Sequence, residues 1–434
     1  MRRLLPAGLR KAIRRMNGFA QRIRARRAFD RERLILIADC LAAALAAALP
    51  WSTSAAGILS ALLLVAILPT LDVPLIRRVL STPAGGVPLL LLALAIVGTL
   101  WATDANWAER FDGLKPYLKL FFIPLLIVQF SRSTRGVWVM LAFLVSCTVL
   151  LALSWLLVLR WALSPELRIF PVLLFGIPVR DYIAQSGEFT VCIFLLAKLA
   201  LDDWRAGQSR RAIAYLALAV AFLANILYVA TSRTMLVVIP ALLLVFAWKQ
   251  LSRKAMIAVV VAGAVAGVAV WVVAPPVRTN ITGAFSEIQE FQPGDPTSRA
   301  GLRMEFWRKS VEFIAAAPII GHGVGSRLAL FQPADRNGVA VAPTINPHNQ
   351  VLAVAIRLGL VGTAVLFAFW FTHLWLFRGE GLVAWAGLTI VTQNIVGSMF
   401  NSHLFDFSQG WLYVIGVGVA AGMMLKSDPD FRRT

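Results

Sequence analysis

Long runs of apolar residues, separated by short polar segments, make up most of the chain. A helix needs about 18–25 such residues to cross the roughly 30 Å hydrocarbon core of a bilayer, and many of the runs approach that length. They predict an all-α polytopic membrane protein with about twelve transmembrane helices, rather than a soluble protein of buried helices. The predicted helices cover residues 34–51, 54–72, 87–101, 115–130, 137–159, 188–201, 212–230, 235–248, 255–274, 356–377, 382–400 and 409–425.

The polar segments divide the predicted protein into five parts. Residues 1–33 form a basic amphipathic cytoplasmic segment, 34–274 hold helices one to nine, 275–355 form a large outside loop, 356–425 hold helices ten to twelve, and 426–434 form a cytoplasmic tail. Lys and Arg clusters follow the even-numbered helices. The positive-inside rule therefore places both termini in the cytoplasm.

The large loop is expected to be partly helical. Four prolines between positions 275 and 298 predict irregular backbone there, because proline interrupts a helix interior. A capped helix is expected to begin near Arg299 and to end at Pro318, with Arg303 and Trp307 on one side of it. The glycine-rich turn 321–326 that follows has two readings, a structural turn or a phosphate-binding loop.

Composition supports a membrane protein and narrows its chemistry. Hydrophobic residues make up 59% of the chain and charged residues 15%, whereas soluble domains average about 25% charged. The net charge of +20 could suggest nucleic acid, but the basic residues lie between apolar runs, so no nucleic-acid partner is expected. The three cysteines all fall inside apolar runs, which excludes a disulfide scaffold. The outer segments lack metal-ligand and ATP-binding motifs, so we expect neither a metal nor a cofactor.

The polar chemistry that remains outside consists of arginines and a histidine. Arg180 precedes a predicted helix, where Asp181 could neutralise it, and Arg233 is the only charge in the corner 231–234. His348 lies at the mouth of the tenth predicted helix. Guanidinium groups bind phosphate oxygens through two donors at once, and a histidine titrates near neutral pH. Together they predict an outer-face site for a phosphorylated substrate.

The order of these motifs resembles the O-antigen ligase and O-antigen polymerase superfamily of bacterial inner membranes, over roughly residues 170–400. The motifs, in chain order, are Arg180-Asp181, Ser232-Arg233-Thr234, Arg303 with Trp307, Pro318–Gly323, and His348-Asn349.

The resemblance implies a glycosyltransferase with a periplasmic active site. It implies a donor glycan linked to undecaprenyl diphosphate and, for the ligase branch, an acceptor hydroxyl on lipid A–core. Arg180, Arg233 and His348 are carried over as catalytic residues: His348 as the base in an inverting attack, and the arginines as ligands of the departing diphosphate. Arg303, His322 and Asn349 are expected to bind substrate.

Three alternatives to a ligase stay open. A polymerase and a protein O-oligosaccharyltransferase of the same superfamily share the motifs and differ in the acceptor. A multispan transporter is the remoter alternative, because transporter sites lie at mid-membrane in broken helices, whereas the chemistry here gathers outside. The basic character of the large loop favours a phosphate-rich acceptor such as lipid A–core, and hence the ligase.

Overall fold

The computed structural model describes residues 30–102, 104–163, 176–292, 299–331, 346–427 and 431, and this part of the chain is all-α, without a β-strand. The predicted fold class is thus confirmed. Most of the basic amphipathic segment 1–33 lies outside the described residues.

The helices are residues 30–48, α2 (Thr53–Ile67), η1 (Leu68–Thr70), α3 (Val73–Ser81), α4 (Pro83–Gly98), α5 (Trp107–Leu118), η2 (Lys119–Phe121), α6 (Phe122–Arg132), α7 (Gly136–Leu163), α9 (Tyr182–Arg205), α10 (Ser209–Tyr228), α11 (Met235–Gln250), α12 (Arg253–Val273), α13 (Pro275–Gln289), α14 (Arg299–Ala316), α15 (Arg327–Phe331), α16 (Gln350–Leu376), α17 (Leu382–Ser398) and α18 (Phe407–Ser427).

Each of the twelve apolar runs coincides with helical structure, but not every helix is long enough to cross a membrane. Among the described residues, seven helices are long and apolar enough to do so, or eight if α3 and α4, bent by 86°, count as one broken span. The helices α11 and α17 are apolar but shorter. Twelve membrane crossings therefore stay a prediction.

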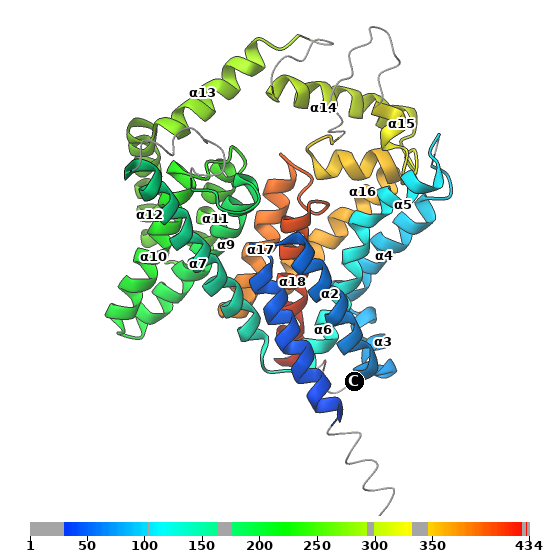
Figure 1. Cartoon of the computed structure of the whole chain (residues 1–434), viewed down its shortest axis with the longest axis horizontal. Helices are drawn as coiled ribbons and strands as arrows, with labels where there is room; N and C mark the ends of the chain where they lie inside the picture. Colours follow the sequence, from blue (N-terminus) through cyan, green and yellow to red (C-terminus); the bar gives the residue numbers. More distant parts are fainter. Residues whose placement is uncertain are drawn as a thin grey trace, which may run out of the picture.

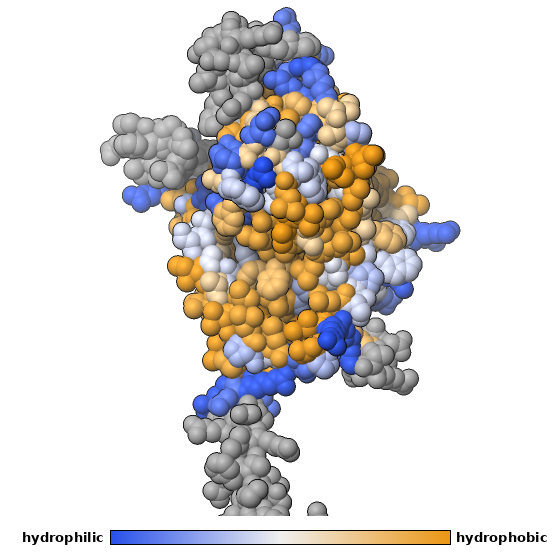
Figure 2. Space-filling view, turned by 90° about the vertical axis from the view of Figure 1, so that its right-hand side faces the viewer, coloured by the Kyte–Doolittle hydropathy of each residue, from blue (hydrophilic) through white to orange (hydrophobic). Residues whose placement is uncertain are grey.

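The helix α18 lies at the centre of the bundle and packs against α6, α7, α9 and α17 (Figure 1). Its surface is buried over most of its length, whereas α12 buries none of its residues. Helices α13 and α14 extend across one end of the bundle, and α14 contacts α16. In the face shown in Figure 2, hydrophobic residues cover the middle and hydrophilic ones gather toward both ends, as expected of a protein surrounded by lipid.

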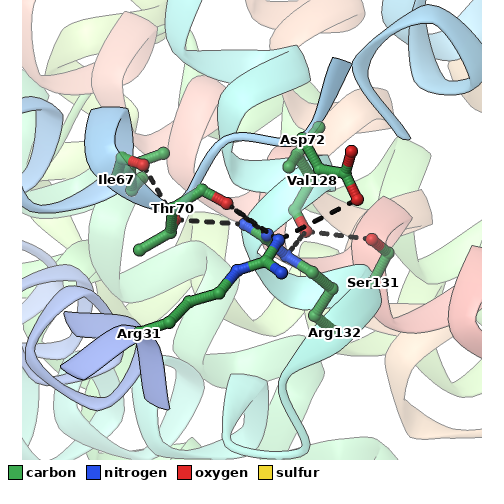
Figure 3. Close-up of polar contacts among 7 residues, drawn as sticks. All are labelled: Arg31, Ile67, Thr70, Asp72, Val128, Ser131 and Arg132. Carbon is green, nitrogen blue, oxygen red and sulfur yellow. Dashed lines mark hydrogen bonds and ion pairs between the residues drawn. The ribbon is translucent and has the colours of Figure 1, made fainter. Parts of the chain in front are cut away.

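Two arginines join three helical segments at the end of the bundle opposite α14 (Figure 3). Arg31 and Arg132 both donate to the carbonyl of Thr70, at 3.2 and 2.7 Å, where η1 ends. Arg31 also lies 3.9 Å from Asp72. Cations are stabilised at helix C-termini because the last carbonyls lack partners within the helix. The two hydrogen bonds to the Thr70 carbonyl therefore connect the helix 30–48, η1 and α6 at this end of the bundle.

The first part of the segment 275–298 departs from the expected irregular backbone, because residues Pro275–Gln289 form the helix α13, while residues 293–298 lie outside the described residues. The prediction was wrong because Pro275 and Pro276 occupy the first helical turn, where the missing N–H has no partner to lose. The next helix, α14, begins at Arg299 and ends at Ala316, close to its predicted limits.

The helix α16 is broken in its middle, and the segment 318–323 occupies the break. Gly359 has φ +60°, and the amides of His322 and Gly323 donate to the carbonyls of Ile356 and Arg357, at 2.8 and 2.9 Å. A side chain at Gly359 would place its Cβ 2.2 Å from the Ile319 oxygen. Glycine is therefore required here by both conformation and space.

Candidate functional site

A cavity of about 290 Å³ lies close to the starts of α9 and α18 and the turn before α16. Its wall is formed by three chain segments where helices begin: the residues around the starts of α9 and α18, and the turn before α16. Helix N-termini carry partial positive charge and favour anions. The lining residues are Arg180, Asp181, Ile183, Ala184, Asn346, His348, Asn401, Asp406, Phe407, Ser408 and Gln409.

His348 stands in this wall with a left-handed backbone, φ +48°. Its amide donates to Asn346 Oδ1 at 3.0 Å, and its ring Nδ1 lies 3.2 Å from Asn401 Oδ1. Burial lowers the pKa of His348 below its ordinary value, and the positive charge of Arg303 lowers it further, while the Asn401 contact raises it. A neutral imidazole at neutral pH is the form that can accept a proton.

Arg180 lines the same cavity and also has a left-handed backbone, φ +63°. Its guanidinium donates to the carbonyl of Leu49 at 3.1 Å and lies over the Phe407 ring, 5.4 Å from the centroid. Asp181 does not form the expected ion pair with it. Instead Asp181 caps α9, accepting from the amides of Ile183 and Ala184, both at 2.8 Å.

The short segment 401–406, between α17 and α18, contributes residues that the sequence analysis did not select. Asn401 and Asp406 line the cavity, and Asn401 Nδ2 donates to Asp406 Oδ2 at 2.9 Å. Burial raises the pKa of Asp406 to about 6, against the lowering effect of Lys119. No sequence pattern singles these two residues out, because nothing local indicates that this segment meets His348.

The helix α14 reaches the same turn. Trp307 Nε1 donates to the carbonyl of Pro347 at 2.8 Å, directly before His348. The charge of Arg303 acts on the His348 imidazole. The role of Arg303 in substrate binding stays a prediction.

Arg233 is not among the residues that line this cavity. Its guanidinium pairs with the carboxylate of Glu287 on α13, with contacts of 2.7 and 3.4 Å. The Arg233 side chain retains 32% exposure. The structure therefore brings Arg180 and His348 together and places Arg233 against the α13 helix.

The remaining two predicted site residues, His322 and Asn349, form hydrogen bonds with the backbone around the site. The Nε2 atom of His322 lies 2.8 Å from the carbonyl of Phe313, and its backbone fills the α16 break. Asn349 caps α16 through the amides of Val351 and Leu352, at 2.9 and 3.1 Å. Neither residue lines the cavity.

In the part of the chain that the structure describes, no three His, Cys, Asp or Glu side chains gather as ligands of a metal ion. The side chains that line the cavity supply a guanidinium that can bind phosphate, an imidazole that can accept a proton, and amide and carboxylate groups that can hydrogen-bond to hydroxyls.

A family model described as O-antigen ligase matches residues 218–367. The matched segment runs from α10 to the second half of α16 and includes Arg233, Arg303, His322, His348 and Asn349. No match is found among curated proteins.

Proposed function

We propose that this chain is an O-antigen ligase, because residues 218–367 match a family model of that description. In this proposal it transfers a glycan from undecaprenyl diphosphate to a sugar hydroxyl of lipid A–core, in lipopolysaccharide biosynthesis. The observation that carries the proposal is that Arg180 and His348, far apart in the sequence, line one cavity at the start of helices.

In the proposed reaction, His348 Nε2 takes the proton of the acceptor hydroxyl while that oxygen attacks the anomeric carbon of the donor. The bond from that carbon to the diphosphate oxygen breaks on the opposite side, so the configuration inverts. Undecaprenyl diphosphate leaves with the bonding electrons. Arg180 binds the leaving diphosphate, whose negative charge grows in the transition state. Such a donor contributes about 10²–10³-fold in rate and a positioned base about 10²–10⁴-fold.

Arg233 enters this reaction only by exchanging partners. Its guanidinium is paired with Glu287, so we propose that a donor phosphate replaces this carboxylate. Glu287→Gln removes the competing charge and is expected to lower the KM for donor, whereas Arg233→Lys is expected to raise it. If Arg233 only ties α13 to the 231–234 corner, both variants will lower the melting temperature and leave KM unchanged.

We further propose that the protein lies in the bacterial inner membrane, with both termini in the cytoplasm and the cavity facing the periplasm. The positive-inside bias supports this orientation, since the start of the helix 30–48 and the end of α6, which hold Arg31 and Arg132, lie at the end of the bundle opposite α14.

The basic residues of the large loop favoured lipid A–core as the acceptor, but the structure weakens this argument because several of these residues pair with acidic side chains. Arg308 pairs with Glu305 and Glu312, and Lys309 lies 3.8 Å from Glu305. These pairs neutralise part of the α14 surface. The ligase proposal therefore depends on the family match and the cavity, and the polymerase is the alternative that the test must separate.

The lipopolysaccharide of a deletion strain separates the two enzymes. Loss of a ligase leaves core without O-antigen while lipid-linked polymer accumulates, whereas loss of a polymerase leaves core bearing one repeat unit. Complementation with wild type should restore the full ladder, and complementation with Arg180→Met should not. Substrate flux across liposomes without consumption of lipid-linked glycan would instead indicate a transporter.

A further inference from the structure

The side chain of Asn401 faces His348 on one side and Asp406 on the other. Its Oδ1 lies 3.2 Å from His348 Nδ1, and its Nδ2 donates to Asp406 Oδ2 at 2.9 Å. Two neighbours fix this orientation of the amide. The Asp406 carboxylate only accepts, so it requires the NH₂ group, and the Ser402 amide only donates, at 3.0 Å to Oδ1.

The orientation of the amide determines which ring nitrogen of His348 carries the proton. Since Asn401 Oδ1 can only accept, the Nδ1 atom facing it must be the protonated one. The Nε2 atom is then left with its lone pair free, as a general base requires. A neutral histidine with the opposite tautomer would have no acceptor site at Nε2.

The backbone at Asp406 is bound by the buried side chain of Lys119. Lys119 Nζ donates to the carbonyls of Phe405 and Asp406, at 3.3 and 2.6 Å. A side chain at Gly410 would place its Cβ 2.2 Å from this Nζ atom, so glycine at that position leaves room for the lysine. The charge of Lys119 also offsets the cost of a buried Asp406 carboxylate.

We propose that Asn401 is a positioning residue that fixes His348 as the Nδ1–H tautomer, and that Asp406, held by Lys119, fixes the Asn401 amide. This inference rests on the proposed function for its kinetic consequence, but the tautomer itself exists without any substrate. The arrangement resembles the logic of a catalytic triad, with an amide between the imidazole and the carboxylate.

The first test measures the tautomer directly. Protein labelled with ¹⁵N-histidine has only four histidines, and the His348 signals are those lost in His348→Gly. The ¹⁵N shifts should show the Nδ1–H tautomer above the histidine pKa in wild type, and a mixture of tautomers in Asp406→Asn. Wild-type protein with the Nε2–H tautomer would overturn the proposal, whether or not the protein proves to be a ligase.

The second test exchanges the two side chains. Asp406→Asn lets the 401 amide turn round, and we expect kcat to fall by about 10–100-fold with little change in KM. In the double variant N401D/D406N, an aspartate at 401 accepts from His348 Nδ1–H and from the Ser402 amide, while an asparagine at 406 donates to it. All three hydrogen bonds are restored, so kcat should recover by at least about tenfold relative to Asp406→Asn.

We also expect the double variant to shift the pH profile of kcat/KM. A carboxylate in contact with the imidazole raises the pKa of His348, so the acidic limb of kcat/KM should move to higher pH. The single variant Asn401→Ala removes the contact, and its loss of kcat should persist at every pH. A folded double variant with the kcat and pH profile of Asp406→Asn alone would overturn the proposal.

The charged groups around His348 in all these variants are Arg303 of α14, Arg180 and Asp181 before α9, and position 406 with its neighbour Lys119.

Discussion

Replacing His348 by glycine tests the proposed base at little cost to the fold. The residue has φ +48°, a conformation that costs a side chain about 1–2 kcal/mol and glycine nothing. Against this relief stand the lost Asn401 contact of 3.2 Å, about 0.5–1.5 kcal/mol, and the greater unfolded-state freedom of glycine, about 0.5–1 kcal/mol. The three contributions nearly cancel, so the free energy of unfolding should change by no more than about 1 kcal/mol.

The effect on the reaction should be much larger. Loss of a positioned base lowers the transfer rate by about 10²–10⁴-fold, equal to about 2.7–5.4 kcal/mol in the barrier. The assay is glycan transfer by purified protein from a lipid-linked donor to lipid A–core, with thermal unfolding measured in parallel. Added imidazole should restore part of the activity of His348→Gly and have no such effect on wild type. A folded His348→Gly protein that transfers glycan at the wild-type rate would refute the base assignment.

Three further changes probe the site and the fold. The positive charge of Arg303 helps lower the pKa of His348, so Arg303→Met should raise that pKa and move the acidic limb of kcat/KM to higher pH, since only the neutral imidazole accepts a proton. Arg180→Lys keeps the charge but not the two-pronged donor, so donor transfer should fall by about 10–100-fold in kcat/KM, measured at fixed acceptor. Gly359→Ala forces a Cβ to within 2.2 Å of a backbone oxygen at positive φ, and should destabilise the protein by about 2–4 kcal/mol in thermal unfolding. Gly267→Ala, where a Cβ meets nothing within 4 Å, is the matched control and should be neutral or stabilising.

The helices were predictable because a bilayer imposes one solution on a long apolar run. Every backbone N–H and C=O in hydrocarbon needs a partner, and a helix supplies it locally. Apolar length alone therefore located the helical runs. The helix α13 was missed because the same proline that interrupts a helix interior is favoured in its first turn. The break at Gly359 lies inside an apolar run, so the sequence does not indicate it. The structure explains the break, because the segment 318–323 forms hydrogen bonds with the backbone of α16 there.

The sequence predicted which types of residue form the candidate site, but not all of the particular residues that line it. Arg180 and His348 were selected because arginine can bind phosphate and histidine can accept a proton near neutral pH, and the structure places them in one cavity. Arg233 was selected on the same grounds, yet it pairs with Glu287, a partner on a helix that the sequence did not predict. Asn401 and Asp406 have ordinary residue types in an ordinary loop, so only tertiary structure connects them with His348.

The two short motifs, Arg180-Asp181 and His348-Asn349, share one structural cause. In each, the second residue caps a helix through two backbone amides, and the first lies just before the cap with positive φ. Caps of this kind contribute about 0.5–2 kcal/mol, which is enough to hold one residue in a conformation costing about 1–2 kcal/mol. The cap therefore fixes both where the helix starts and where the functional side chain points. A substitution at Asp181 or Asn349 that removes the cap should release this strained backbone and misdirect Arg180 or His348, even though neither cap residue has to touch the reacting atoms.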